Sequence, residues 1–399
     1  MDLHHQYRIK MSMLIKLLSL VLYAGMCLSI SASNSNASSG NLPIARYRSG
    51  SLPHGVLDPQ EGKLYTAYCS ASPNVAQLEG EVDYKQRFLV YVPTSAQLPL
   101  AERTAQLLAL LYTEVHSRFH WDHPYRQTLK VWLTDGPATE VTPDAGGEQI
   151  RDNIYIFDLS APRSPGEWFR EITHEYGHYS LPGVTGFTQP EAWANGFLGQ
   201  RLYPYWIHQD LKAKKIASAN LVFINSAGLK SYLQKQVYPL LQEIGTEKMP
   251  DEHLLNGTYT ASMNYYTGWV VYLNAVYGVP VLFNALCDTH PLSGKFQDTA
   301  PAFIQGALRA IRQISPILLR APITNPSDST ITFPVYLPAG KWRAKPSEQV
   351  HSYSFEPMYH NVKVVKNIVT IMKTGWYRLS LDGSSSTTLP SLLLTRTGE

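Results

Sequence analysis

The sequence predicts an α+β protein: a small mixed sheet with a mostly helical half over residues 81–318, then a small all-β, sandwich-like domain over residues 319–399. Three patterns predict this. Apolar and polar residues alternate within "YKQRFLVYVP", as in a strand, and order should begin there. Apolar residues recur at three- and four-residue steps through most of the chain from Ser164 to about 316, as in helices. After "SPILLRAPITNPSDS" only short β-rich runs broken by turn residues follow.

The beginning of the chain predicts a targeting segment. Arg8, Lys10 and Lys16 flank the apolar run "LLSLVLYAGMCLSI", and the small residues "SASNSNASSG" follow it. This order is that of a secretory signal peptide, here residues 1–32 with cleavage near Ala32. Lys16 leaves the apolar run shorter than the roughly 20 residues that a spanning helix needs. We expect export to a periplasmic or extracellular space, and membrane contact only if the segment is retained.

Residues 33–80 are rich in Ser, Gly, Pro and Asn, which predicts a loosely ordered N-terminal extension. Cys27 falls within the signal segment, so the mature chain keeps Cys69 and Cys287. In an oxidising compartment two cysteines often pair, and we favour a disulfide between them.

The charge of the chain argues against a nucleic-acid partner. The net charge is +3 and no long Lys/Arg run occurs, whereas phosphate backbones are bound by clustered basic residues.

Within residues 81–318 the first long helix is predicted over "LAERTAQLLALLYTEVHSRF". Two strands, "TLKVWLTD" and "DNIYIFDL", follow it, with the Gly/Pro/Asp-rich segment 135–148 between them.

The next helix carries the chemistry. Ser164 is a suitable N-cap, Pro165 suits the first helical position, and Glu167 completes a capping box. On this helix "HEYGH" places His174 and His178 on one face, one turn apart, with Glu175 displaced to the side. Two imidazoles in this spacing can bind Zn²⁺, and the adjacent carboxylate can deprotonate a water.

A catalytic zinc site needs a third protein ligand. The next carboxylate is Glu191 in "TQPEAWANGFLGQRLY", where Thr188 or Gln189 with Pro190 predicts a helix start. A loop of about eight to ten residues can set that helix against the first, with Glu191 in its first turn and Asn195 on the same face. The alternative is that Glu191 only completes a T-x-x-E capping box.

H-E-x-x-H followed by E-x-x-x-D/N resembles the gluzincin-type zinc metallopeptidases. The resemblance implies a zincin-like catalytic domain with His174, His178 and Glu191 as ligands of one Zn²⁺ and Glu175 as general base. Asn195 would then orient a ligand histidine from behind; it stands where Asp is commoner, and the spacing to Glu191 is shorter than in the thermolysin and aminopeptidase branches. The same resemblance makes "DNIYIFDL" the edge strand that pairs with an extended substrate.

The stretch "SMNYYTGWVVYLNAVYG" resembles the later helix of gluzincin aminopeptidases, which carries a tyrosine that stabilises the developing oxyanion. The resemblance points to Tyr265 in this role, although the lysine of the Y-x-K-G motif is missing. Tyr265 also begins a stripe at helical spacing with Trp269, Tyr272 and Val276, which favours core packing.

A second histidine group, His116, His120 and His123, lacks a carboxylate equivalent to Glu175, and we interpret it as a polar helix end. The sequence as a whole predicts a secreted zinc peptidase acting on peptides or proteins. The alternative is a secreted binding or scaffold protein on a zincin fold, with zinc structural or absent. For residues 319–399 three roles stay open: binding of substrate, of carbohydrate or of a partner.

Overall fold

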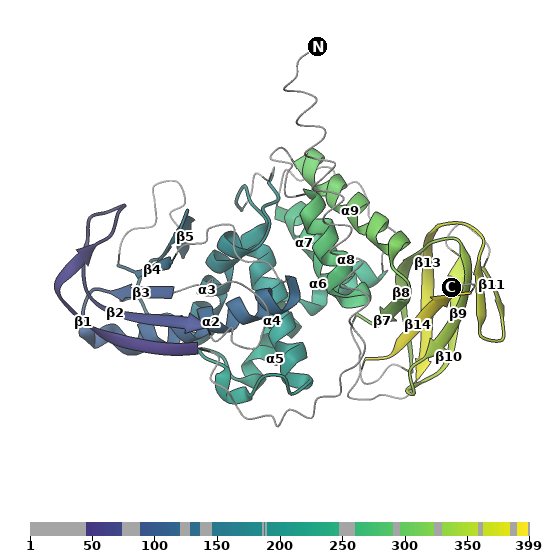
Figure 1. The fold of residues 1–399 in the computed structure, drawn as a ribbon, viewed down its shortest axis with the longest axis horizontal. Helices are drawn as coiled ribbons and strands as arrows, with labels where there is room; N and C mark the ends of the chain where they lie inside the picture. The colour runs from purple at the N-terminus through teal and green to yellow at the C-terminus, as the bar shows by residue number, and fades with distance from the viewer. Residues whose placement is uncertain are drawn as a thin grey trace, which may run out of the picture. The chain divides into compact units, whose positions relative to one another are not determined.

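The computed structural model describes residues 45–73, 88–119, 128–135, 146–185, 187, 190–246, 260–289, 296–322, 329–357, 362–383 and 389–397. The predicted signal segment, His120 and His123 lie outside them. Figure 1 shows a sheet with helices and a separate antiparallel β region toward the C-terminus, so the predicted α+β class is confirmed at this level.

A six-stranded mixed sheet opens the described chain, in the order β1-β2-β3-β4-β6-β5. Its strands are β1 (Ala45–Leu57), β2 (Leu64–Pro73), β3 (Phe88–Val92), β4 (Leu129–Leu133), β5 (Gly147–Ile150) and β6 (Asn153–Ile156). The pairs β3–β4 and β4–β6 are parallel and the others antiparallel. The short 3-10 helix η1 (Ser95–Gln97) and the helix α2 (Leu98–Phe119) provide the crossover that parallel β3 and β4 require.

Two expectations about this sheet are wrong. Much of the supposed loose extension, residues 45–73, forms β1 and β2, because these strands pair with each other and β2 pairs with β3. The strand in "DNIYIFDL" is β6, which lies between β4 and β5, so the edge strand is β5.

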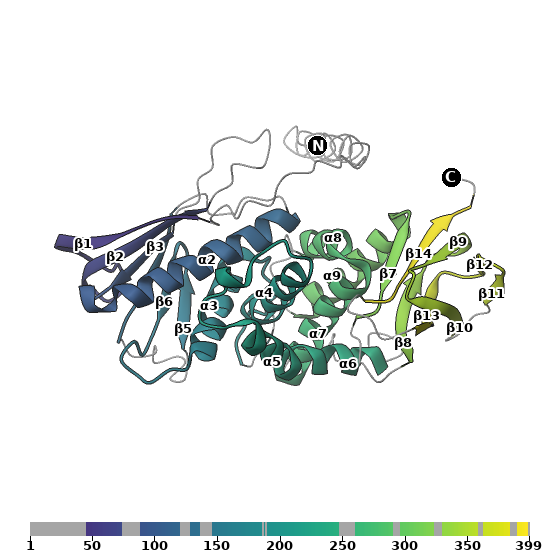
Figure 2. The ribbon, with the colours of Figure 1, turned by 90° about the horizontal axis from the view of Figure 1, so that it is seen from below.

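The alternation of side chains along the strands gives the sheet two apolar faces. On one face Phe88 and Val90 join the main core with α2, whose buried residues include Leu107 and Leu111. Figure 2 shows α2 running along the strands on that side. On the other face Tyr91 and Trp132 stack at 4.4 Å between ring centroids, in a separate aromatic cluster completed by Tyr65, Tyr155 and Phe157.

Cys69 points into the main core and is a free, fully buried thiol. The disulfide expected for it is therefore wrong. Burial raises the pKa of this thiol to about 12, and the nearby Glu102 carboxylate adds to the rise.

The helical half follows the sheet. Its helices are α3 (Pro165–Ser180), α4 (Asn195–Lys212), α5 (Ser226–Gln236), α6 (Tyr238–Thr246), α7 (Thr260–Tyr277), α8 (Val279–Thr289) and α9 (Phe296–Gln313), with a 3-10 turn η2 (Ser218–Asn220). In the described part of the chain, no helix is both long and apolar enough to cross a bilayer.

The C-terminal region consists of two antiparallel sheets, ordered β10-β13-β8 and β11-β12-β9-β14-β7. Their strands are β7 (Ile317–Arg320), β8 (Thr330–Leu337), β9 (Gly340–Pro346), β10 (Val350–Pro357), β11 (Val362–Val365), β12 (Ile368–Ile371), β13 (Gly375–Gly383) and β14 (Ser391–Arg396). Because β7 pairs with β14, the region begins at Ile317, two residues before the boundary expected from the sequence.

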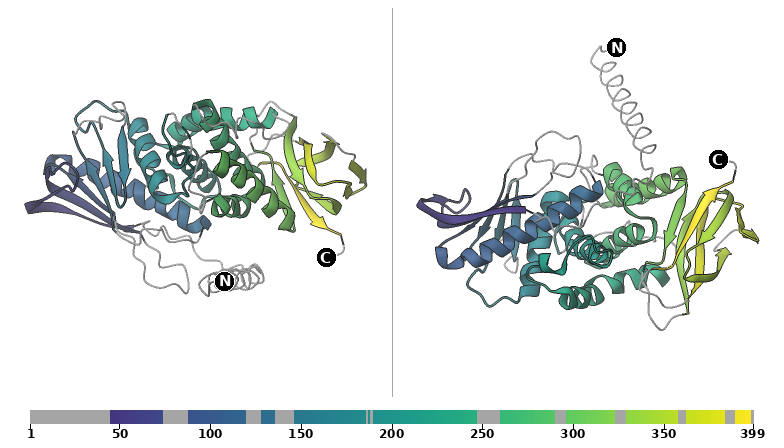
Figure 3. Two further views of the ribbon diagram at one scale, coloured as in Figure 1. Left: turned by 90° about the horizontal axis from the view of Figure 1, so that it is seen from above. Right: turned by 60° about the horizontal axis from the view of Figure 1, so that its bottom comes forward.

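Helix α7 contacts this region, which Figure 3 shows from two further sides. The Tyr272 hydroxyl donates to the Pro334 carbonyl at 2.6 Å, and the Tyr277 hydroxyl donates to the Tyr336 carbonyl at 3.1 Å. Both tyrosines are buried, so these hydrogen bonds satisfy hydroxyls that water does not reach.

Candidate metal centre

Helix α3 begins as the sequence predicted. The Ser164 side chain accepts from the Glu167 amide at 3.3 Å, the Glu167 carboxylate accepts from the Ser164 amide at 2.6 Å, and Pro165 is the first helical residue. The capping box fixes where the helix starts and so which side chains face the interior. His174 and Glu175 are both buried in its second half.

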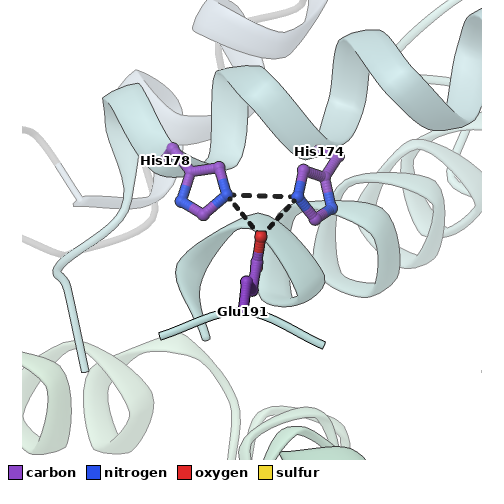
Figure 4. A group of neighbouring side chains, drawn as sticks. All are labelled: His174, His178 and Glu191. Carbon is purple, nitrogen blue, oxygen red and sulfur yellow. Dashed lines mark hydrogen bonds and ion pairs between the residues drawn. The ribbon is translucent and has the colours of Figure 1, made fainter. Parts of the chain in front are cut away.

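Three predicted ligand atoms meet at one point. The Nε2 atoms of His174 and His178 are 3.1 Å apart, and Glu191 Oε2 lies 3.1 Å from the first and 3.2 Å from the second. Figure 4 shows both imidazoles extending from one side of α3 toward the Glu191 carboxylate.

This triangle fits a metal ion. Ligands arranged tetrahedrally at about 2.0–2.1 Å from one ion lie about 3.3 Å from each other, close to the spacings seen here. Two imidazole nitrogens and one carboxylate oxygen are a donor set that suits Zn²⁺. In the described part of the chain, this is the one cluster of His, Cys, Asp and Glu able to hold a metal ion.

The segment that carries Glu191 differs from the prediction. Helix α4 begins at Asn195, with Ala194 as N-cap, and not near Pro190. Trp193 instead forms a β-bridge with Thr185, which holds the preceding residues outside the helix. Glu191 therefore cannot be the third residue of a capping box, and that alternative is wrong.

Asn195 contacts His178, although not because it shares a helical face with Glu191. Its Oδ1 lies 2.9 Å from His178 Nδ1, and its Nδ2 donates to the carbonyls of His178 at 3.0 Å and Leu181 at 3.4 Å. Asn195 thus holds the imidazole and the end of α3 at once.

Three glycines let the two helices approach. A Cβ on Gly199 would lie 2.3 Å from the Thr173 carbonyl oxygen, and one on Gly177 would lie 2.5 Å from the backbone oxygen of Asn195. The backbones of α3 and α4 are therefore in direct contact. A Cβ on Gly196 would lie 2.3 Å from His178 Nε2 and 2.6 Å from His174 Nε2. The absence of a side chain at Gly196 keeps open the space in front of both nitrogens.

Contacts within the cluster shift the pKa values of Glu191 and His178. Burial would raise the pKa of Glu191, but hydrogen bonds to both histidines outweigh it and hold that pKa at about 2. Burial would lower the pKa of His178, but its hydrogen bond to Glu191 and the nearby carboxylates outweigh it and raise that pKa. Both shifts share one cause, the attraction between the Glu191 carboxylate and the two imidazoles.

Glu175 lies beside the cluster. Burial raises its pKa to about 7, and the neighbouring histidines offset only part of this rise. Its Oε2 is buried and has no hydrogen-bond partner among the described residues. A Cβ on Gly147 would lie 2.8 Å from Glu175 Cγ, so the edge strand β5 passes directly against this carboxylate.

Tyr265 lies on α7 and packs edge-on against Trp269, with 6.5 Å between ring centroids. The four residues of its helical stripe, Tyr265 to Val276, are all buried, so the expected core packing is confirmed. Its role as an oxyanion donor stays a prediction.

His116 is buried on α2 and stacks on Tyr112, with 5.5 Å between ring centroids. The sequence reasoning missed Gln200, whose Nε2 lies 2.7 Å from His174 Nδ1. The sequence signal for Gln200 was its position four residues after Gly196 on α4. Residues at that spacing share a helical face, and Gly196 faces both histidines.

Comparisons with known proteins give little. No family model matches the chain, and no curated protein matches it. Among solved structures, the Legionella pneumophila aminopeptidase A in complex with aspartic acid is similar with a TM-score of 0.33 and 10% identity over 87% of this chain. The match covers 42% of that protein's chain. A likeness of this size bears on neither the family nor the activity of the chain.

Proposed function

We propose that this chain is a zinc-dependent peptidase. The observation that carries the proposal is the meeting of His174, His178 and Glu191 at the spacing of metal ligands, with a buried carboxylate, Glu175, beside them. A bound Zn²⁺ would supply a Lewis acid and lower the pKa of a coordinated water. Among the described residues three donors meet, which supports a catalytic rather than a structural ion, because structural zinc sites have four protein ligands and catalytic sites have three.

Glu175 is the general base of this proposal. Burial raises its pKa above the usual range of a carboxyl group, which makes it a stronger base than an exposed glutamate. It takes one proton from the attacking water as the C–O bond forms. It gives that proton to the leaving amine nitrogen as the C–N bond breaks, so the carboxylate is regenerated.

Substrate would bind along β5. This strand is the edge of the sheet and runs against Glu175 through Gly147. An extended peptide can add to such an edge through backbone hydrogen bonds, which would bring its scissile bond to the base. Tyr265 is proposed as the donor to the developing oxyanion, and Asn195 as the residue that orients His178.

Export through the N-terminal segment belongs to the same proposal, on the basis of the signal-like pattern of residues 1–32. The C-terminal sheets would support α7 through Tyr272 and Tyr277, whatever else they bind.

The test combines zinc analysis of the purified protein with digestion of a peptide library by the wild type and by Glu175→Gln. We expect about one zinc per chain and cleavage that the variant loses by at least about 100-fold. Glu114→Gln is the matched control, because Glu114 on α2 is also a buried carboxylate whose pKa burial raises to about 7. It should leave cleavage unchanged.

Two outcomes would contradict the proposal. In the first, the wild type holds one zinc but cleaves no peptide that Glu175→Gln leaves intact. The chain would then be a binding or scaffold protein with a structural ion. A protein that retains no zinc would remove the metal assignment as well.

A further inference from the structure

Each of the two candidate ligand histidines meets a carboxamide from α4 at its Nδ1 atom. Asn195 Oδ1 lies 2.9 Å from His178 Nδ1, and Gln200 Nε2 lies 2.7 Å from His174 Nδ1. The sequence resemblance accounts for Asn195 alone. Gln200 is therefore a second carboxamide contact, with its nitrogen rather than its oxygen toward the ring.

The crossing of α3 and α4 delivers Gln200 to this point. Gly199, its neighbour in sequence, touches Gly177 through bare backbone: a Cβ on Gly199 would lie 2.8 Å from Gly177 Cα. Gly196 and Gln200 are one turn apart on the same face of α4, so that face offers space to His174 Nε2 and an amide to His174 Nδ1.

The backbone of Gln200 is held in place. The residue is 5% exposed, and its backbone oxygen accepts from the Tyr232 hydroxyl at 3.2 Å. Its side-chain oxygen faces Arg201 Nη1 at 3.5 Å. Arg201 is in turn held through Nη2 by Asn264 Oδ1 at 3.0 Å. The backbone of Gln200 is thus fixed beside His174, whereas its side-chain oxygen makes only a long contact.

We infer that Gln200 is a positioning residue for His174, which fixes the ring so that Nε2 points to the metal. The inference rests on the proposed metal site. His174 Nε2 can bind an ion only when it carries no proton, so the ring proton must then be on Nδ1. A carboxamide offers an NH₂ group to a bare Nδ1 and an oxygen to a protonated Nδ1. As placed, Gln200 suits the ring whose Nδ1 is bare, because its Nε2 faces that atom. When the proton is on Nδ1, rotation of the amide by 180° brings Oε1 to accept from it, in exchange for the 3.5 Å contact with Arg201.

This role predicts a different result for two substitutions of similar size. Gln200→Leu removes both hydrogen-bonding options and leaves Nδ1 without a partner. Gln200→Glu keeps an acceptor, favours the proton on Nδ1, and so favours a free Nε2. Arg201 lies within reach of the new carboxylate and would offset its charge.

The test is a competition titration of Zn²⁺ between the metal-free protein and a chromophoric chelator. We expect Gln200→Leu to weaken zinc binding 10- to 100-fold, the range for loss of a partner behind a metal-ligating histidine. We expect Gln200→Glu to bind zinc at least as tightly as the wild type. Thermal melts of the metal-free variants report stability separately.

Asn274→Leu is the matched control. Asn274 on α7 is also a buried amide that contacts α4, since its Oδ1 accepts from Trp206 Nε1 at 3.3 Å, but it does not touch a histidine of the site. It should lower the melting temperature and leave zinc affinity unchanged.

Gln200→Leu that binds zinc within about twofold of the wild type would overturn the inference, and so would an equal loss in Gln200→Leu and Gln200→Glu. Failure of the proposed function is a distinct result, because the wild type itself would then bind no zinc.

Discussion

Gly196→Ala places a methyl group against both nitrogens that would bind the proposed metal ion. The new Cβ would lie 2.3 Å from His178 Nε2 and 2.6 Å from His174 Nε2, whereas ordinary van der Waals contact begins at 3.4 Å. Both nitrogens must therefore retreat by about 1 Å to relieve the overlap. Metal–ligand distances tolerate about 0.2 Å. The displacement is several times that tolerance, so neither histidine can keep its place at the ion.

We expect Gly196→Ala to lose more than about 100-fold in zinc affinity, which corresponds to about 2.7 kcal/mol. The fold of the metal-free protein should survive, because alanine stabilises a helix by about 1 kcal/mol relative to glycine and the two histidines can turn aside. The assay pairs a zinc competition titration with thermal unfolding of the metal-free protein followed by circular dichroism.

Gly166→Ala is the control for the same substitution. Gly166 lies in the first turn of α3, and a Cβ there would meet only Ser164 Oγ, at 4.0 Å. It should leave zinc affinity unchanged. If Gly196→Ala binds zinc within about threefold of the wild type, the ion is not held between these two nitrogens and the metal assignment is refuted.

Three further predictions concern the fold. Burial raises the pKa of Glu114 to about 7, because its ion pair with Arg118 offsets only part of the burial. A carboxyl group with a raised pKa destabilises the fold as pH rises from about 4.5 to 7. The free energy of unfolding of Glu114→Gln should therefore exceed that of the wild type by up to about 3 kcal/mol at pH 8 and by little at pH 4. Urea unfolding at both pH values measures the difference. Tyr277→Phe should lower the unfolding free energy by about 1–3 kcal/mol, since it leaves the Tyr336 carbonyl and amide without their shared partner; a change below about 0.5 kcal/mol would mean that α7 does not depend on this contact. Gly199→Ala should destabilise the metal-free protein by more than about 2 kcal/mol, because its Cβ would lie 2.3 Å from the backbone oxygen of Thr173, and a thermal melt equal to that of the wild type would contradict the close helix crossing.

The parts of the site that the sequence predicted are those fixed within one helix. The Ser164–Glu167 capping box sets the start of α3, and the helical repeat then fixes which face His174 and His178 share. The same repeat places Glu175 to the side of that face. These are local properties, so a single stretch of sequence carries enough information to predict them.

The parts that it missed depend on pairing between distant segments. Residues 45–73 are polar and rich in turn-forming types, yet they form strands because β2 finds a partner in β3. Glu191 reaches the histidines from an extended segment, and the Thr185–Trp193 bridge, not a helix cap, determines its place. The sequence of each segment alone does not indicate which distant residues it pairs with.

The closeness of α3 and α4 links these findings to the chemistry. Helix axes usually pack about 8–10 Å apart, with side chains between them, but Gly177 and Gly199 remove the side chains at the crossing. At that short separation the Asn195 and Gln200 side chains reach the Nδ1 atoms of His178 and His174 on the opposite helix. The glycine crossing therefore lets two neutral amides contact the histidines of the proposed metal site, and Gly199→Ala should weaken zinc binding as well as the fold.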